Sequence, residues 1–224
     1  MNPKLLFTLL AGIGPFITLF KVKTLLDKLS EKTRCIAILG MKGAGKTTLW
    51  NALRGKLNVE YEPTFEEEIK EFKIQVENRE VGIATTKDIG GDYQFVKGYG
   101  ELIKDGTFIY FLIDINELNI KGKELEEKRL NVRSRLDKIL KLVTGENGKK
   151  NCGIMIFATH KDVFLDNIGR QLCDADLTQF VIKKLNLSQE PIGNSSNGSK
   201  WKIKPIDLTD DSSIQNIKME IVNS

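Results

Sequence analysis

The strongest constraint on the fold is the stretch Gly40-Met41-Lys42-Gly43-Ala44-Gly45-Lys46-Thr47, which matches the phosphate-binding loop pattern G-x-x-x-x-G-K-[ST] at every fixed position. Glycines let the backbone N–H groups of such a loop turn inward, and the helix that follows adds partial positive charge. The lysine contributes a mobile charge to the β- and γ-phosphates, and the threonine hydroxyl is an oxygen ligand suited to Mg²⁺. The loop therefore predicts a nucleotide site with a magnesium ion.

The sequence on either side supplies the setting that this loop requires. Residues 35–39 form a short apolar, β-branched run, which is typical of a buried parallel strand. Residues 48–53 have apolar side chains at helical spacing, and Gly55 follows as a helix stop. This order of strand, loop and helix favours a phosphate site over a glycine turn that binds nothing.

Strands and helices alternate along the rest of the chain. Buried strands are predicted at residues 108–113, 154–158 and 202–208, and an antiparallel hairpin is predicted from 69–76 and 81–85. Helices are predicted at residues 93–104, 123–143, 177–187 and 213–222, the second with a solvated charged face. We expect an α/β fold, a three-layer sandwich with a mostly parallel six-stranded sheet and one antiparallel edge strand.

Three candidate site segments follow predicted strands: Gly40, Asp88 and residues 159–162. Ligands of open α/β sheets bind at the carboxyl ends of the strands. We therefore expect these segments to converge on one crevice.

Composition narrows the classes of function. The net charge of +4 is mild, and lysines are interleaved with glutamates, so nucleic acid is not an expected partner. The three cysteines, Cys35, Cys152 and Cys173, show no C-x-x-C spacing and are predicted to be small buried side chains in a reducing compartment. The only histidine is His160, which argues against a site with several histidine ligands.

Residues 1–33 are predicted to be a hydrophobic membrane anchor with a charged connector, followed by a domain at residues 34–224. Residues 5–20 carry no charge, but the run is slightly short for a membrane span and contains Gly12, Gly14 and Pro15. A cleaved signal peptide is disfavoured because no small-x-small site follows. A terminal helix or hairpin that packs on its own domain, or lies in the membrane interface, remains an alternative. Lysines after the run predict a membrane-anchored protein whose second domain faces the cytoplasm.

From about residue 35 to residue 222 the chain resembles the small Ras-like P-loop GTPases, most closely the ADP-ribosylation-factor-like group. An anchor before such a domain is also similar to the β subunit of the signal-recognition-particle receptor. Pro63-Thr64 resembles the first switch of the group, and Asp88-Ile89-Gly90-Gly91 matches its D-x-G-G second switch. Thr159-His160-Lys161-Asp162 occupies the place of the guanine motif [NT]-K-x-D.

The resemblance implies GTP or GDP as cofactor, Mg²⁺, and an unknown protein effector. It implies metal ligation by Thr47, Thr64 and Asp88, the last through water, and catalytic roles for Thr64 and for the residue at position 92, which is Asp92. The implied nucleotide contacts are Gly40, Met41, Lys42, Gly43, Ala44, Gly45, Lys46, Thr47, Thr48, Gly91, Thr159, His160, Lys161 and Asp162. Within this set, the Gly91 N–H would contact the γ-phosphate and Asp162 would accept two hydrogen bonds from guanine.

The chain departs from the pattern of the group at three places. His160 stands where the guanine motif has lysine, and Thr209-Asp210-Asp211 matches the last base-contacting motif poorly. Asp92 occupies the place of the water-orienting glutamine and adds negative charge beside the transferred phosphoryl group, so GTP hydrolysis is expected to be slow. Three functions stay open: a membrane-tethered GTP switch, a GTP-locked scaffold that recruits a partner, and an ATP-binding protein.

Overall fold

The computed structural model describes residues 33–56, 65–144, 148, 151–187 and 202–223. Two compact units divide the chain, Met1–Thr33 and Arg34–Ser224, and the helices and sheets below concern the second. The predicted anchor at residues 5–20 and the candidate Thr64 lie outside the described residues. Within the described residues, no helix combines the length and the apolar character needed to cross a membrane.

The centre of the fold is a parallel sheet in the order β2-β7-β8-β9. Its strands are β2 (Ile36–Gly40), β7 (Phe108–Asp114), β8 (Gly153–Thr159) and β9 (Lys202–Pro205). The first three are almost continuously apolar and buried, as expected where helices cover both faces of a parallel sheet. Three of the predicted strands are thereby confirmed, and the fourth ends early, at Pro205.

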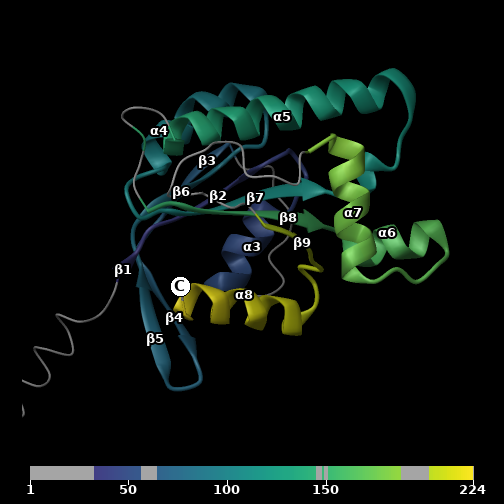
Figure 1. The fold of residues 1–224 in the computed structure, drawn as a ribbon. Coiled ribbons are helices and arrows are strands. Elements are labelled where there is room, and N and C mark those ends of the chain that lie inside the picture. The colour runs from purple at the N-terminus through teal and green to yellow at the C-terminus, as the bar shows by residue number, and fades with distance from the viewer. Residues whose placement is uncertain (1–32, 57–64, 145–147, 149–150, 188–201, 224) are drawn as a thin grey trace, which may run out of the picture. The chain divides into compact units, whose positions relative to one another are not determined.

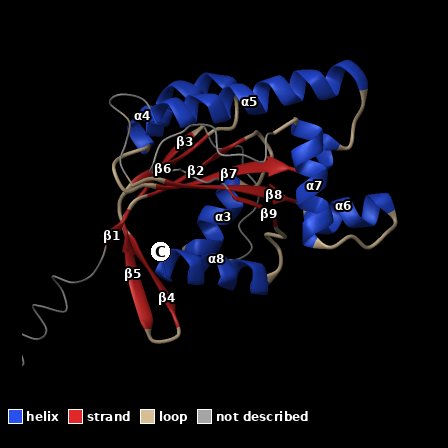
Figure 2. Cartoon of the chain, in the orientation of Figure 1, coloured by secondary structure: helices blue, strands red, loops and turns tan. Residues whose placement is uncertain are grey.

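Helices lie on both sides of this sheet (Figures 1 and 2). Helix α5 (Gly122–Thr144) covers one face, while α3 (Lys46–Leu53) and α8 (Asp211–Asn223) lie on the other. Helix α7 (Asp174–Leu185) packs beside α5. The predictions for residues 48–53, 123–143, 177–187 and 213–222 are confirmed to within a few residues.

Two predictions for helices need correction. Residues 93–104 form a 3₁₀ turn, η1 (Tyr93–Gly98), and only one turn of α-helix, α4 (Tyr99–Leu102). Sequence analysis missed α6 (Lys161–Ile168), in which Phe164 is the only buried residue, because one apolar contact gives no helical periodicity.

The remaining strands form two further groups. The antiparallel hairpin joins β4 (Phe72–Val76) to β5 (Arg79–Ile83) and belongs to a sheet in the order β1-β5-β4, where β1 is Thr33–Arg34. A separate antiparallel pair joins β3 (Glu66–Ile69) to β6 (Thr86–Ile89). The predicted hairpin is confirmed in part. Its first strand is interrupted after Ile69 and resumes at Phe72, and its second strand ends at Ile83 instead of residue 85. One continuous six-stranded sheet is not confirmed, since the described strands form three hydrogen-bonded groups.

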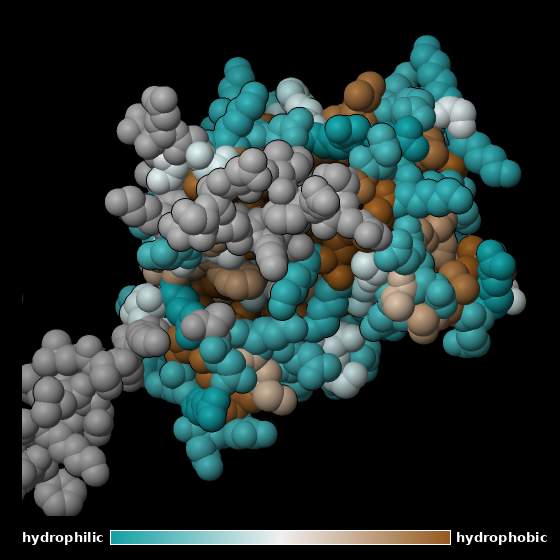
Figure 3. Space-filling view, viewed as in Figure 1, coloured by the Kyte–Doolittle hydropathy of each residue, from teal (hydrophilic) through white to brown (hydrophobic). Residues whose placement is uncertain are grey.

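Aromatic side chains pack against each other in the interior. Tyr110 stacks on Phe157 across β7 and β8 with ring centroids 5.0 Å apart, and Trp50 of α3 meets Phe72 edge-on at 6.4 Å. The face of the molecule seen in Figure 3 is mainly hydrophilic where residues are described.

The prediction that the cysteines are buried is wrong. Cys35 and Cys152 are half-buried, and Cys173 is exposed. Cys173 stands before α7, where its Sγ lies 3.0 Å from Asp176 Oδ2. Its place in the sequence next to leucine misled the prediction because it belongs to a helix cap rather than to the core.

Candidate functional site

The phosphate-binding loop connects β2 directly to α3. Gly40 has a φ of 143°, and a Cβ atom there would lie 2.2 Å from the carbonyl oxygen of Leu112 on β7. Gly43 and Gly45 are left-handed, with φ of 73° and 82°. Met41 N–H donates to the same Leu112 oxygen at 3.0 Å. The glycines therefore allow the loop to turn sharply while it lies against the central strand.

Backbone donors of the loop are only partly used. The Ala44 N–H donates to Met41 O at 3.4 Å, which closes a turn inside the loop. The amides of Gly43 and Gly45 have no acceptor among the described residues. Since α3 begins at Lys46, these donors lie at a helix N-terminus, where an anion is favoured.

Lys46 is a buried cation within this loop. Its side chain is 7% exposed and its Nζ donates to Met41 O at 2.9 Å. Burial lowers the pKa of Lys46 to about 8, although the charge of Asp88 opposes this effect. No carboxylate of the described part of the chain lies within ion-pair distance of Nζ. A bound anion would compensate this charge.

Asp88 and Thr47 face each other beside the lysine. Thr47 Oγ1 donates to Asp88 Oδ2 at 2.6 Å. Asp88 is 1% exposed, burial raises its pKa, and its Oδ1 has no hydrogen-bond partner among the described residues. A buried carboxylate oxygen without a donor fits a hard cation such as Mg²⁺. The described residues contain no cluster of three acidic, histidine or cysteine side chains, so other ligands would have to complete the coordination.

The segment that follows β6 lies on the loop. A Cβ on Gly91 would be 2.3 Å from Lys42 N and 2.4 Å from Lys42 Cα, so only glycine fits this contact. Asp92 Oδ1 lies 3.5 Å from Lys42 Nζ, in a pair whose side chains are at least half exposed. The cavity left between the segment and the loop, which Phe65 also lines, holds about 100 Å³.

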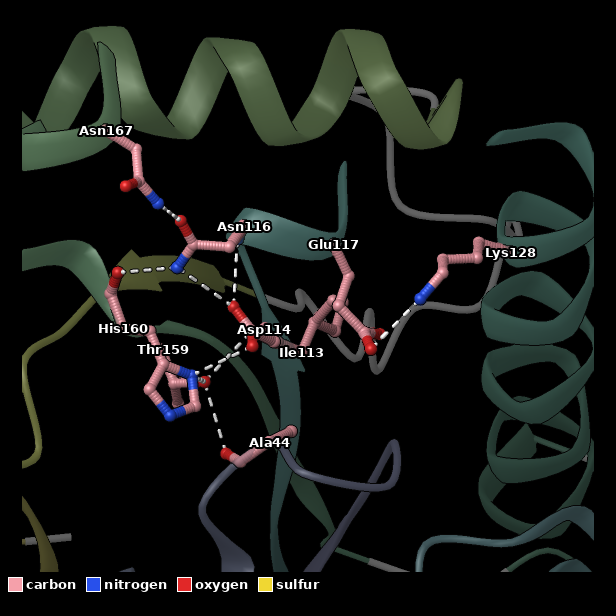
Figure 4. A network of polar contacts seen from close by, with 9 residues as sticks. All are labelled: Ala44, Ile113, Asp114, Asn116, Glu117, Lys128, Thr159, His160 and Asn167. Atoms are coloured by element: carbon pink, nitrogen blue, oxygen red, sulfur yellow. Dashed lines mark hydrogen bonds and ion pairs between the residues drawn. The ribbon is translucent and has the colours of Figure 1, made fainter. Parts of the chain in front are cut away.

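Thr159 ties the end of β8 to the loop. Its buried hydroxyl lies 3.1 Å from Ala44 O and 3.1 Å from Ile113 O, and it can donate to either (Figure 4). The structure therefore brings the predicted residues Gly40 to Thr48, Asp88, Gly91, Asp92 and Thr159 to one end of the sheet.

The other predicted base-contacting residues stand at the start of α6. His160 is the N-cap and adopts a left-handed conformation with a φ of 57°. Lys161 Nζ points toward α7, where it pairs with Asp174 at 2.5 Å. Asp162, in the first turn of α6, is half-buried and has no hydrogen bond or ion pair to another described residue. Its carboxylate is therefore available to a ligand.

His160 is paired with an aspartate that sequence analysis did not single out. Asp114, the last residue of β7, places Oδ2 3.3 Å from His160 Nδ1. The hydrogen bond to Asp114 raises the pKa of His160. Burial would raise the pKa of Asp114, but hydrogen bonding to His160 and Asn116 holds it below the usual value. Its position at the carboxyl end of a predicted strand was the signal that could have found it.

Two more residues at the site were missed. Arg135 of α5 is 1% exposed, and its Nη1 lies 3.3 Å from Gly40 O, so the predicted solvated face of this helix is wrong at Arg135. Leu208 packs against Gly45, where a Cβ would lie 2.6 Å from Leu208 Cδ1. Neither contact has a local sequence signal, because both depend on tertiary packing. Of the poorly matched last motif, Asp210 caps α8 through Ser212 and Ser213.

A comparison with models of protein families identifies one family for this chain. The model of the ADP-ribosylation factor family matches residues 20–189. A search of curated proteins returns no match.

Two solved structures are similar to this chain at low identity. One is a GDP-bound Roco2 RocCORdC structure from Methanosarcina barkeri, with 12% identity and a TM-score of 0.47 over 85% of this chain and 48% of the other. The chain therefore spans about half the length of that protein. The second is an ADP-ribosylation factor-like GTP-binding protein, the small COPII coat GTPase SAR1, from Encephalitozoon cuniculi in complex with GDP, with 19% identity and a TM-score of 0.46 over 88% and 84% of the two chains.

Proposed function

Since the chain belongs to the ADP-ribosylation factor family and is therefore a GTP-binding protein, we propose that it acts as a membrane-tethered switch that hydrolyses GTP slowly with Mg²⁺. One observation carries the proposal: Lys46 is a buried ammonium group in a loop whose Gly43 and Gly45 amides have no acceptor among the residues that the structure describes. Such a site costs free energy when empty and fits an anion.

The proposed roles follow from the positions of the side chains. Lys46 and the loop amides, from Gly40 to Thr48, hold the phosphates. Thr47 and Asp88 would hold Mg²⁺, and the family resemblance adds Thr64 as a further ligand. The ion would neutralise negative charge that builds up on the β- and γ-phosphate oxygens. Asp162 accepts hydrogen bonds from the guanine base. Thr159 holds the segment of residues 159–162 against the phosphate-binding loop through Ala44 O.

The switching element is the segment from Asp88 to Asp92. In this structure the Gly91 backbone lies close against the backbone of Lys42. A γ-phosphate that enters between the two would move this segment away from the loop, and the Gly91 N–H could then bind the phosphate. Movement of this kind would expose a different surface to a protein effector.

The finer topology is part of the proposal. Strand β6 packs beside β2, although no ladder between them is formed. We expect β3 and β6 to extend the sheet in the order β3-β6-β2-β7-β8-β9, with β3 as the antiparallel edge. Hydrogen exchange of the β6 amides that face away from β3 tests this, because those amides should exchange slowly only if β6 also pairs with β2.

Nucleotide analysis of the purified full chain tests the central proposal. We expect bound GDP or GTP with Mg²⁺, and loss of binding in Lys46→Ala and Thr47→Asn. Asp162→Asn should lower the affinity for GTP relative to nucleotides with other bases. Asp166→Asn should not, because Asp166 is an exposed carboxylate one turn further along α6. Equal competition by ATP and GTP would instead support the ATP-binding alternative.

A scaffold that binds GTP without hydrolysing it is the second candidate. Asp92 favours it, because a carboxylate beside the transferred phosphoryl group opposes the developing negative charge. Its pairing with Lys42 at 3.5 Å also holds it away from a water-orienting role. We expect Asp92→Gln to speed single-turnover hydrolysis. Fast hydrolysis by the unaltered protein would reject the scaffold.

Tethering by residues 1–33 is a separate part of the proposal. It rests on the uncharged run at residues 5–20 and the lysines around it. The full chain should float with liposomes and resist extraction at high pH. Leu9→Lys combined with Ile17→Lys should release it, because two charges in the apolar run oppose insertion.

A further inference from the structure

A compact polar network joins the carboxyl ends of β7 and β8. Asp114 Oδ1 accepts hydrogen bonds from Asn116 N at 2.9 Å and from Asn116 Nδ2 at 3.2 Å, while Oδ2 faces His160 Nδ1 (Figure 4). Both oxygens of this carboxylate therefore hold a neighbour in place.

Asn116 connects three elements through one side chain. It stands at the start of η2 (Asn116–Leu118), and its Nδ2 also donates to His160 O at 3.2 Å. Its Oδ1 accepts a hydrogen bond from Asn167 Nδ2 of α6 at 3.1 Å. The end of β7, the residue after β8 and the body of α6 are thus linked at Asn116.

The network holds a backbone conformation that is unfavourable by itself. His160 is left-handed, with a φ of 57°, a region that non-glycine residues rarely adopt. Asn116 binds its carbonyl oxygen and Asp114 binds its ring, so the conformation is held at two points. Helix α6 starts from this residue, and Asp162 lies in its first turn.

We propose that Asp114 and Asn116 are positioning residues for base specificity, because they hold His160 in the left-handed conformation from which α6 presents Asp162 to the guanine base. This inference rests on the proposed function. The ligand group is the edge of guanine that carries N1–H and the exocyclic amine, two donors that one carboxylate can accept. Neither side chain hydrogen-bonds directly to the loop from Gly40 to Thr48 among the described residues. The network reaches the loop indirectly, since His160 Nδ1 lies 3.2 Å from Thr159 Oγ1, and the Thr159 contact with Ala44 O does not depend on Asp114 or Asn116. Phosphate binding should therefore be insensitive to both.

The test compares base selectivity with phosphate binding in the full chain. Dissociation constants for GDP, ADP and pyrophosphate are measured with Mg²⁺ by competition against a fluorescent GDP. In Asn116→Ala and in Asp114→Asn we expect the preference for GDP over ADP to fall by about tenfold or more, because a misplaced carboxylate no longer matches the two guanine donors. Affinity for pyrophosphate should stay within about twofold of the parent.

The matched control removes a polar contact in the same neighbourhood that does not reach the network. Lys128 Nζ pairs with Glu117 Oε1 at 2.9 Å and joins α5 to η2. Lys128→Met should keep the full preference for GDP over ADP. If the preference for GDP over ADP fell in Lys128→Met as much as in Asn116→Ala, the effect would reflect general destabilisation of this region, and the proposal would be overturned.

The outcomes separate this inference from the proposed function. An unaltered protein that binds ADP as well as GDP refutes guanine binding itself. Folded variants that keep the parental preference, or that lose GDP, ADP and pyrophosphate equally, refute the positioning role. If Asn116→Ala does not fold, Asp114→Asn decides, because it keeps the shape of the side chain and removes its charge. The same ratio of GDP to ADP affinity is measured.

Discussion

Replacing Lys46 by methionine should leave the nucleotide-free protein at least as stable while destroying its phosphate site. The folded state lowers the pKa of Lys46 from 10.5 to about 8. Each pH unit of difference is worth about 1.4 kcal/mol, so the buried charge costs roughly 3 kcal/mol near pH 7. Loss of the hydrogen bond to Met41 O removes about 1.5–3 kcal/mol of this gain. We expect Lys46→Met to be between equally stable and about 2 kcal/mol more stable.

The pH dependence gives the sharper measurement. Because the folded-state pKa of Lys46 lies below the unfolded value, the unfolded chain binds more protons between about pH 8 and 10.5. The cost is therefore fully present below pH 8 and is lost as the pH rises. Between pH 7 and pH 10 the parent should gain about 2 kcal/mol relative to Lys46→Met. The difference between the two proteins cancels the titration of other groups.

Urea unfolding without nucleotide, at pH 7 and at pH 10, provides the assay. Lys42→Met is the control, because Lys42 lies in the same loop but is 70% exposed and should change stability by less than about 0.5 kcal/mol. GDP with Mg²⁺ at about 100 times its dissociation constant should stabilise the parent by about 2.7 kcal/mol and Lys46→Met by much less. The reasoning would be refuted if Lys46→Met were less stable than the parent by more than about 1 kcal/mol at pH 7 and this difference were the same at pH 10.

Three further predictions concern the packing around the loop. Gly40→Ala should lower the free energy of unfolding by about 3 kcal/mol or more, since the new Cβ meets Leu112 O at 2.2 Å; a loss below about 1 kcal/mol in urea unfolding would contradict the close approach of β2 and β7. Asp88→Asn should stabilise the metal-free protein at neutral pH. Burial raises the pKa of the Asp88 carboxyl, so the parent loses folding stability as the pH rises past the pKa of the unfolded state. Thermal unfolding with EDTA measures this, and a variant that is less stable than the parent by the same amount at pH 4 and at pH 7 would argue against it. Trp50→Phe should lower the free energy of unfolding by only about 1–2 kcal/mol. The variant loses buried apolar area, but it also removes a buried Nε1 that has no hydrogen-bond partner among the described residues. A loss above about 4 kcal/mol would show that the indole nitrogen does have a partner.

Much of the fold was predictable because its signals are local. The apolar runs that became β2, β7 and β8 are short and bounded by charge or glycine, and the spacing of Leu125, Val132, Leu136 and Ile139 marks the buried side of α5. Helix α6 was missed because its only buried residue is Phe164. The order of strands is a matter of non-local pairing, and a sequence pattern gives no register between strands that lie far apart in the chain.

The residues of the candidate site also differ in whether a local sequence pattern identifies them. Gly40, Gly43, Gly45, Lys46 and Thr47 were identifiable because a fixed pattern of residue types is needed to turn the backbone around an anion. Arg135 was not, because it acts through Gly40, which lies 95 positions away in the chain.

By itself the sequence determined where the chain must turn and where it must be buried, since glycine conformations and apolar periodicity are properties of neighbouring residues. Only the tertiary structure decided that the Lys46 ammonium lies without a carboxylate partner in the described residues, that Gly91 rests on Lys42, and that Asp114 and Asn116 hold His160. Burial and pairing are set by atoms from distant segments, and these segments meet only when the sheet brings the ends of its strands together.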